Sequence, residues 1–283
     1  MEFIYSGPER KRENIIGVRF KPNPNGPVRI LEEPLWEDGS PIIQNLYVAG
    51  IDGIDIGQAE TSKETRDPSK FCTMIKRRVH GMKEPMYVAY YLDRPDDIRE
   101  AYKQTMAMLW YYQAKANIEA TRLSVLTYAR DNKFAHFFMR RPRACYGGDE
   151  KRRTNNQYGT TATTAMIDHG TDLVASYVED YCHNIWFIEF LEQLNLYTDE
   201  NKGKFDMVAA CQMAEVGDEE LSDIIPREYK PVSKEFRDIG YYTDEHGVRR
   251  YGVIPKYNEL QVKGQINTGY VEGYNITSNP NYR

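Results

Sequence analysis

The chain has 283 residues and a formal net charge of -5 at pH 7, from 37 Lys and Arg against 42 Asp and Glu, so it is not a polycation and any contact with nucleic acid requires local basic patches. The four cysteines, Cys72, Cys145, Cys182 and Cys211, are scattered without zinc-ligand spacing, which favours a reducing setting. No apolar run has the length of a signal peptide or a membrane span, so we expect a cytoplasmic protein that does not bind membranes.

Residues 1–44 are expected to be an irregular lead-in. Residues 21–27 are rich in the Pro, Asn and Gly residues that form turns, and residues 28–31 are a short extended piece. Neither segment suggests a functional site.

The first strand is predicted in residues 45–57. An apolar run ends at Asp52, with Gly50 before it and Gly53 after it, and such a run suits a strand buried on both faces of a sheet. An isolated Asp at this place usually caps a turn. An ionised carboxylate at the tip of a buried strand otherwise requires a compensating positive charge, and a divalent metal ion would supply one.

The next residues predict a hairpin and a helix. Residues 71–79 and 86–91 read as two strands joined by a turn near Gly81, which would pair antiparallel. Pro95 is expected to be the first residue of a helix, whose apolar positions from Ile98 to Trp110 recur at three- and four-residue spacing.

A second set of elements follows. Residues 114–119 predict a fourth strand that also ends on a carboxylate, Glu119. A helix over residues 123–130 and a fifth strand over residues 134–139 come next.

The composition then becomes basic, and two interpretations have about equal weight. The segment is either a solvated loop or a basic loop that contacts phosphates. Its candidate DNA-binding residues are Arg140, Arg141, Arg143, Lys151, Arg152 and Arg153.

Helical patterns resume near Thr163, where one face is apolar through Tyr181. An apolar stripe on a following helix comprises Ile185, Phe187, Ile188 and Leu191. Residues 205–214 predict a compact helix of small residues that can press closely on a sheet, with Asp206 at its N-terminus.

Three carboxylates therefore end or begin elements: Asp52, Glu119 and Asp206. If the first and fourth strands are neighbours, their tips lie side by side, and the late helix can bring Asp206 to the same point. Such a cluster requires a counter-charge, and oxygen-only ligands favour Mg²⁺ or Mn²⁺. Two such ions would support phosphodiester hydrolysis.

Three motifs resemble the nuclease domain of the large terminase subunit of tailed bacteriophages: Tyr47–Asp52, Asn117–Glu119 and Lys204–Ala210. Tyr158–Thr161 is similar to the family's segment between the second and third acids, so the resemblance covers roughly residues 40–216.

The resemblance implies a ribonuclease H-like α/β fold, with a mixed central sheet flanked by helices. The nuclease domain would span residues 45–225, followed by a Tyr-rich extension at residues 226–283 in which short strands are expected near Arg249. The implied activity is a metal-dependent endonuclease that cuts concatemeric viral DNA during packaging in the host cytoplasm. Its implied partners are double-stranded DNA and the terminase ATPase motor, the portal or the small terminase subunit.

Carried over by position, Asp52, Glu119 and Asp206 become catalytic ligands of two Mg²⁺ or Mn²⁺ ions, and Asp55 matches an accessory acid. The family's ATPase motor has no counterpart here, because the chain contains no G-x-x-x-x-G-K-[ST] loop. Two alternatives stay open: another ribonuclease H-like nuclease, of the junction resolvase or transposase type, and a catalytically silent packaging-assembly module.

Overall fold

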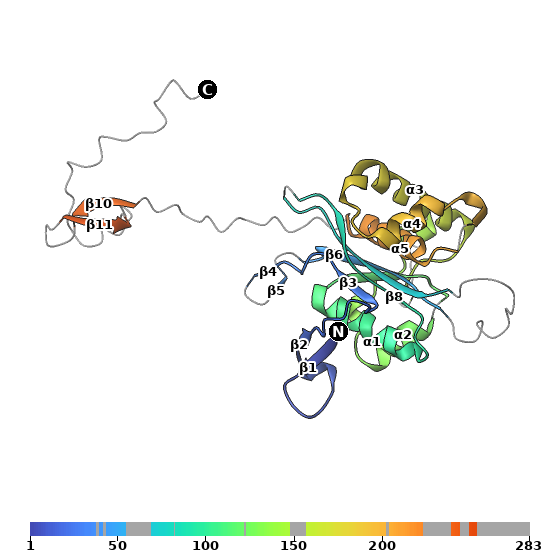
Figure 1. Ribbon diagram of the computed structural model, residues 1–283, viewed down its shortest axis with the longest axis horizontal. Coiled ribbons are helices and arrows are strands. Elements are labelled where there is room, and N and C mark those ends of the chain that lie inside the picture. The colour runs from blue at the N-terminus through green and yellow to red at the C-terminus, as the bar shows by residue number, and fades with distance from the viewer. Residues whose placement is uncertain are drawn as a thin grey trace, which may run out of the picture. The chain divides into compact units, whose positions relative to one another are not determined.

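The computed structural model describes residues 1–37, 40–41, 44–54, 69–81, 83–121, 123–147, 157–201, 204–222, 239–243 and 249–253. The chain divides into two compact units, Met1–Pro226 and Arg227–Arg283. The first unit is a mixed α/β structure in which a central sheet has helices on both faces (Figure 1). Among these residues, no helix is long and apolar enough to cross a membrane.

The central sheet has five strands in the order β3-β8-β7-β6-β9. These strands are β3 (Val28–Ile30), β8 (Met86–Asp93), β7 (Phe71–Arg77), β6 (Tyr47–Asp52) and β9 (Lys115–Ile118). β7 and β8 pair antiparallel as predicted. β6 also pairs antiparallel with β7, whereas β6 and β9 run parallel. Because Ile51 is in register with Ile118, Asp52 at the end of β6 and Glu119 directly after β9 lie at the same edge of the sheet.

The central strand β6 is buried on both faces, as its apolar run predicted. Tyr47, Ala49 and Ile51 point into a core that is closed by α1 (Ile98–Tyr112) and α2 (Leu123–Asp131). The alternate positions, Val48 and Gly50, face the opposite layer of helices.

That opposite layer consists of α3 (Thr164–Tyr181), α4 (Ile188–Leu196) and α5 (Asp206–Ser222). α5 lies directly against β6, because a Cβ atom at Gly50 would lie 1.8 Å from the carbonyl oxygen of Ala210 and 2.4 Å from the amide nitrogen of Ala214. The predicted close packing of this small-residue helix is therefore present, and the helix extends eight residues beyond the predicted end at Ala214.

A buried ionic cluster fixes the C-terminal half of α5 on the sheet. The ammonium group of Lys76 on β7 lies 2.5 Å from a carboxylate oxygen of Glu215 and 2.8 Å from one of Asp218. Tyr87 on β8 donates a hydrogen bond of 2.7 Å to the second oxygen of Glu215. These contacts fix the position of α5 over the sheet, and with it the position of Asp206, the first residue of this helix.

Four expectations differ from the structure. The first 44 residues, expected to be irregular, contain the hairpin of β1 (Glu2–Tyr5) and β2 (Ile15–Arg19) as well as the edge strand β3. The helix predicted to begin at Pro95 begins at Ile98, since the Asp97 carboxylate accepts a hydrogen bond from the amide of Arg99 and caps the helix.

The predicted fifth strand is a 3-10 helix, Ala135–Phe137, followed by an isolated parallel bridge between Phe138 and Ala116. The apolar residues of this segment are buried in the structure, as they would be in a strand, so the apolar pattern did not distinguish a strand from a 3-10 helix. The predicted stripe on α4 is also wrong: Ile185 and Phe187 are buried ahead of the helix, and Ile188 and Leu191 are exposed.

The remaining elements are short. They are β4 (Trp36–Glu37), β5 (Ser40–Pro41) and the 3-10 helices Arg12–Asn14, Arg143–Tyr146, Cys182–Asn184 and Asp199–Asn201. In the second unit, β10 (Ile239–Thr243) pairs antiparallel with β11 (Arg249–Val253).

Candidate active site at the ends of two parallel strands

Asp52, Glu119 and Asp206 line a single cavity of about 220 Å³. Asp52 is the last residue of β6, Glu119 directly follows the parallel neighbour β9, and Asp206 is the first residue of the helix that packs on β6. The structure thus brings together three side chains that are 67 and 87 positions apart along the sequence (52 to 119 and 119 to 206). Their convergence results from the β6-β9 register and from the close approach of α5 at Gly50.

The carboxyl group of Asp206 has a raised pKa. Burial raises the pKa of its carboxyl group, and the amide of Lys70, which donates a 3.0 Å hydrogen bond to Oδ2, opposes that rise together with the charges of Lys70 and Arg94. Desolvation by burial is therefore the main cause of the raised pKa. Arg94 also donates a hydrogen bond of 2.8 Å to the carbonyl oxygen of Ser69 at the rim of the cavity.

This raised pKa predicts how the stability of the metal-free chain depends on pH. The folded-state pKa of Asp206 lies above the unfolded value, so the folded chain binds the proton more tightly. The stabilisation of the fold that results from this is fully present below the unfolded pKa and is lost as pH rises through the folded pKa. We expect Asp206→Asn to unfold at higher urea concentration than the parent at neutral pH, with the advantage disappearing under acid conditions. Urea unfolding with a chelator at several pH values measures this difference, and a constant difference across pH would contradict it.

Glu119 is held in place by a neighbouring segment, residues 158–161. The amide of Thr160 donates to the carbonyl of Ile118 at 2.8 Å, and the amide of Ala120 donates to the carbonyl of Thr160 at 2.7 Å. Gly159 has φ +72°, and a Cβ atom there would lie 2.3 Å from the Ile118 oxygen. Only glycine therefore permits this approach, which fixes the backbone on both sides of Glu119.

Asn117 joins three elements beneath the site. Its fully buried side-chain amide donates to the Thr160 hydroxyl at 2.8 Å and to the carbonyl of Met213 on α5 at 2.9 Å. A buried polar side chain with paired donors orders the groups around it. We read Asn117 as a positioning residue for Glu119, and the sequence signal that could have found it is a single amide between the apolar residues Ala116 and Ile118.

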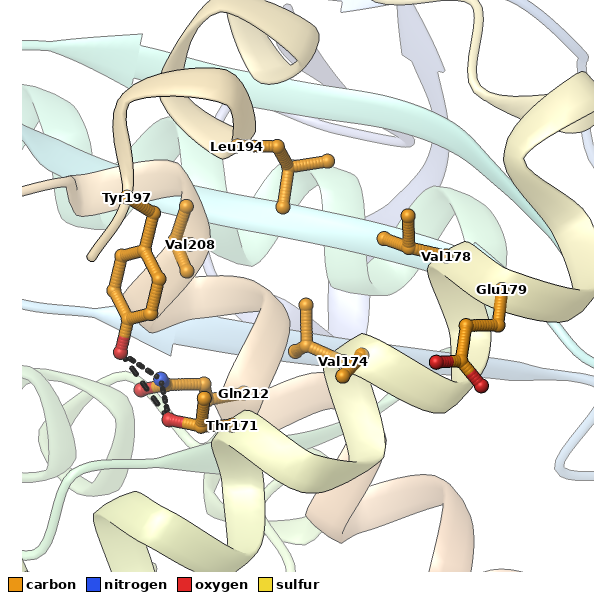
Figure 2. Close-up of a pocket in the computed structure, with 9 residues that line it drawn as sticks. Thr171, Val174, Val178, Glu179, Leu194, Tyr197, Val208 and Gln212 are labelled. Carbon is orange, nitrogen blue, oxygen red and sulfur yellow. Dashed lines mark hydrogen bonds between the residues drawn. The ribbon is translucent and has the colours of Figure 1, made fainter. Parts of the chain in front are cut away.

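One wall of the acidic cavity is polar and is shared with a second cavity. Nε2 of Gln212 donates hydrogen bonds of 3.0 Å to the hydroxyl oxygens of Thr171 and Tyr197, as Figure 2 shows. Tyr197 and Gln212 line both the acidic cavity and an apolar cavity of about 320 Å³ formed by α3, α4 and α5. No local sequence pattern links these residues, because only the packing of three helices brings them together.

The candidate DNA-binding residues occupy different settings. Arg140 is exposed. Arg141 donates to the carbonyl of Gly159 at 3.3 Å and to the side chain of Gln157 at 3.0 Å, and Arg143 forms a 3.5 Å ion pair with Glu220 on α5. Two of these guanidinium groups thus stabilise the segment around Glu119 and the end of α5. Lys151, Arg152, Arg153 and the accessory acid Asp55 lie outside the described residues.

The acidic cavity has the donor chemistry that suits a hard divalent cation, since its charged lining groups are all carboxylates. Within the described ranges, no three His, Cys, Asp or Glu side chains lie close enough together to hold a metal ion. The three acids therefore share a cavity without forming one compact ligand set by themselves.

No protein-family model matches the sequence, and no curated protein matches it.

Proposed function

We propose that this chain is a DNA endonuclease that requires divalent metal ions and has a ribonuclease H-like catalytic domain. The observation that carries the proposal is the shared cavity of Asp52, Glu119 and Asp206, contributed by two parallel strand ends and one helix N-terminus. Acids from separate elements have no packing reason to meet, and their meeting leaves negative charge in a partly buried place.

The sheet supports the finer fold assignment. β6, β7 and β8 form an antiparallel meander. α1 then connects β8 to β9, which runs parallel to β6. The isolated bridge between Phe138 and Ala116 continues the sheet beyond β9. A mixed sheet of this kind, with a late helix over its first long strand, is the arrangement that the resemblance to the terminase nuclease domain implies.

The chain's own groups suggest how the site would operate. Asp52, Glu119 and Asp206 would hold Mg²⁺ or Mn²⁺, which, when bound, lowers the pKa of a water and stabilises the leaving oxygen of a phosphodiester. Asn117 and Thr160 keep the backbone at Glu119 in position. Lys70 and Arg94, whose charges reach Asp206, are placed to meet a substrate phosphate.

The biological setting that we propose is the cutting of concatemeric viral DNA during genome packaging in the host cytoplasm. The partners would be double-stranded DNA and an ATPase motor, portal or small terminase subunit. Support comes from the three motifs and their order along the chain. This sequence itself contains no motor motif.

The experiment that tests this function is incubation of the chain with supercoiled plasmid. We expect conversion to nicked and linear DNA with Mn²⁺ or Mg²⁺, and none with EDTA. Intact supercoiled plasmid under all metal conditions would contradict the proposal.

A further prediction separates DNA binding from cutting. The variant that leaves the contacts of Arg141 and Arg143 intact combines Arg140→Ala, at an exposed residue, with Lys151→Ala, Arg152→Ala and Arg153→Ala. We expect weaker DNA binding in EDTA for all sequences alike, and a salt dependence reduced by about 0.9 for each lost phosphate contact. Filter binding over a salt series measures it, with Arg130→Ala, exposed on α2, as the control. An unchanged salt slope would make the segment a solvated loop.

A further inference from the structure

The helical layer formed by α3 and α4 carries only negative formal charge. Between Arg153 and Lys202 the sequence contains no Lys or Arg. Its two histidines pair with glutamates from other elements, His169 with Glu219 and His183 with Glu84. The acidic residues of this stretch are Asp168, Asp172, Glu179, Asp180, Glu189, Glu192, Asp199 and Glu200.

The same stretch exposes large apolar side chains. Trp186 is 61% exposed, Ile188 68%, Leu191 42% and Leu196 59%, and these are four of the nine large apolar side chains exposed in the described residues. Ile188, Leu191 and Leu194 are spaced three residues apart on α4, so they follow one another along one side of the helix. Apolar exposure is therefore concentrated on α4 rather than scattered.

Leu194, the last residue of this row, also lines the 320 Å³ cavity, which is open between α3, α4 and α5. Val174 and Val178 from α3 and Leu194 from α4 supply apolar walls, and the carboxylate of Glu179 lies at one end (Figure 2). The polar atoms at the other end, on Thr171, Tyr197 and Gln212, already bond to one another. The groove is thus an apolar surface with an acidic border.

We propose that this groove, lined by Val174, Val178, Glu179 and Leu194 and continued along α4 by the exposed Leu191, docks a basic amphipathic helix of a partner protein. Such a helix would place its apolar face on the walls and its Lys or Arg side chains beside the acidic border, including Glu179 and Asp172. DNA is a poor occupant because this layer bears only carboxylates, and a second copy of the chain would bring two acidic borders together. The proposal does not depend on the nuclease assignment.

The test uses the full chain and two labelled synthetic peptides with the same helical leucine spacing, one with lysine and one with glutamate at all other positions. We expect the Leu-Lys peptide to bind by fluorescence anisotropy, more weakly at high salt, and the Leu-Glu peptide not to bind. Binding should also shift the emission of Trp186 to the blue, and Trp186→Phe should remove that shift.

Two pairs of variants locate the binding. Ile188→Ser with Leu191→Ser should weaken Leu-Lys peptide binding roughly tenfold or more, whereas Val79→Ser, at a side chain 65% exposed elsewhere, should not. Asp172→Lys with Glu179→Lys should weaken it likewise. The control, Glu33→Lys with Asp131→Lys, gives the same net charge of -1 (-5 plus twice 2) and should retain binding.

Several outcomes would overturn the proposal. No binding of the Leu-Lys peptide, equal binding of both peptides, or equal losses in the groove and control charge variants would each do so. A dimer of the parent chain in sedimentation that Ile188→Ser with Leu191→Ser dissociates would assign the surface to a second copy instead.

Discussion

Asp52→Asn, Glu119→Gln and Asp206→Asn should each reduce metal-dependent nicking by at least about a thousandfold, which corresponds to roughly 4 kcal/mol of transition-state stabilisation. Each substitution removes one carboxylate from the shared cavity and keeps the size of the side chain. Because the ligands would act as one unit, a double variant should be little worse than a single one. Initial rates of plasmid nicking in Mn²⁺ measure the effect.

Asp131→Asn is the matched control, since Asp131 is an exposed acid at the end of α2, on the other face of the sheet. It should nick plasmid at the parental rate. Circular dichroism should show that all four variants keep the fold. Full activity in any one of the three cavity variants would remove that residue from the site.

Gly50→Ala should destabilise the fold by about 3 kcal/mol or more, at the upper end of the cost of overpacking a core. The added methyl carbon would collide with the backbone of α5 at Ala210 and Ala214, which cannot rotate away as a side chain can. α5 must then move off β6, and Asp206 moves with it relative to Asp52. We therefore expect nicking to be lost along with stability, as measured by urea unfolding and plasmid assay.

Gly17→Ala on β2 is the control for this substitution. Its added Cβ would make an ordinary contact of 3.5 Å with the Ile4 side chain. We expect a change in the free energy of unfolding of less than about 1 kcal/mol. Equal stability of Gly50→Ala and the parent would show that α5 does not press on β6 as described.

Elements with a strong local pattern could be predicted from the sequence. The buried run of β6, the β7-β8 hairpin, β9 and α2 all follow from apolar patterning over neighbouring residues. β3 was not recognised as a sheet strand, because it has three residues and its partner β8 lies more than fifty positions away. Such a short strand is specified by its partner rather than by its own residues.

α4 shows why periodicity alone misplaces a buried face. Ile185 and Phe187 are buried just before the helix begins, Phe190 is its buried residue, and Ile188 and Leu191 face outward. The sequence pattern predicted that Ile185, Phe187, Ile188 and Leu191 form one apolar stripe. The outward-facing Ile188 and Leu191 belong to the surface that we propose as a docking site.

Some residues of the candidate site could also be predicted from the sequence, and others could not. Asp52, Glu119 and Asp206 could be selected because each stands where a strand or helix ends or begins. The segment Tyr158–Thr161 was singled out only by resemblance, and its hydrogen bonds to Ile118 and Ala120 required the structure. Gln212 could not be selected, since it reaches the cavity through helix packing. The cause of the raised pKa of Asp206, desolvation by burial, also requires the three-dimensional structure.

The central claim is that Asp52, Glu119 and Asp206 together bind divalent metal ions. The most direct measurement is a titration of the chain with Mn²⁺, in which electron paramagnetic resonance follows the free ion. We predict saturable binding of two ions, reduced or lost in Asp206→Asn, and stabilisation of the fold by about 2.7 kcal/mol when Mn²⁺ is at a hundredfold its dissociation constant. The absence of saturable binding at millimolar Mn²⁺, with an unchanged melting temperature, would contradict the claim.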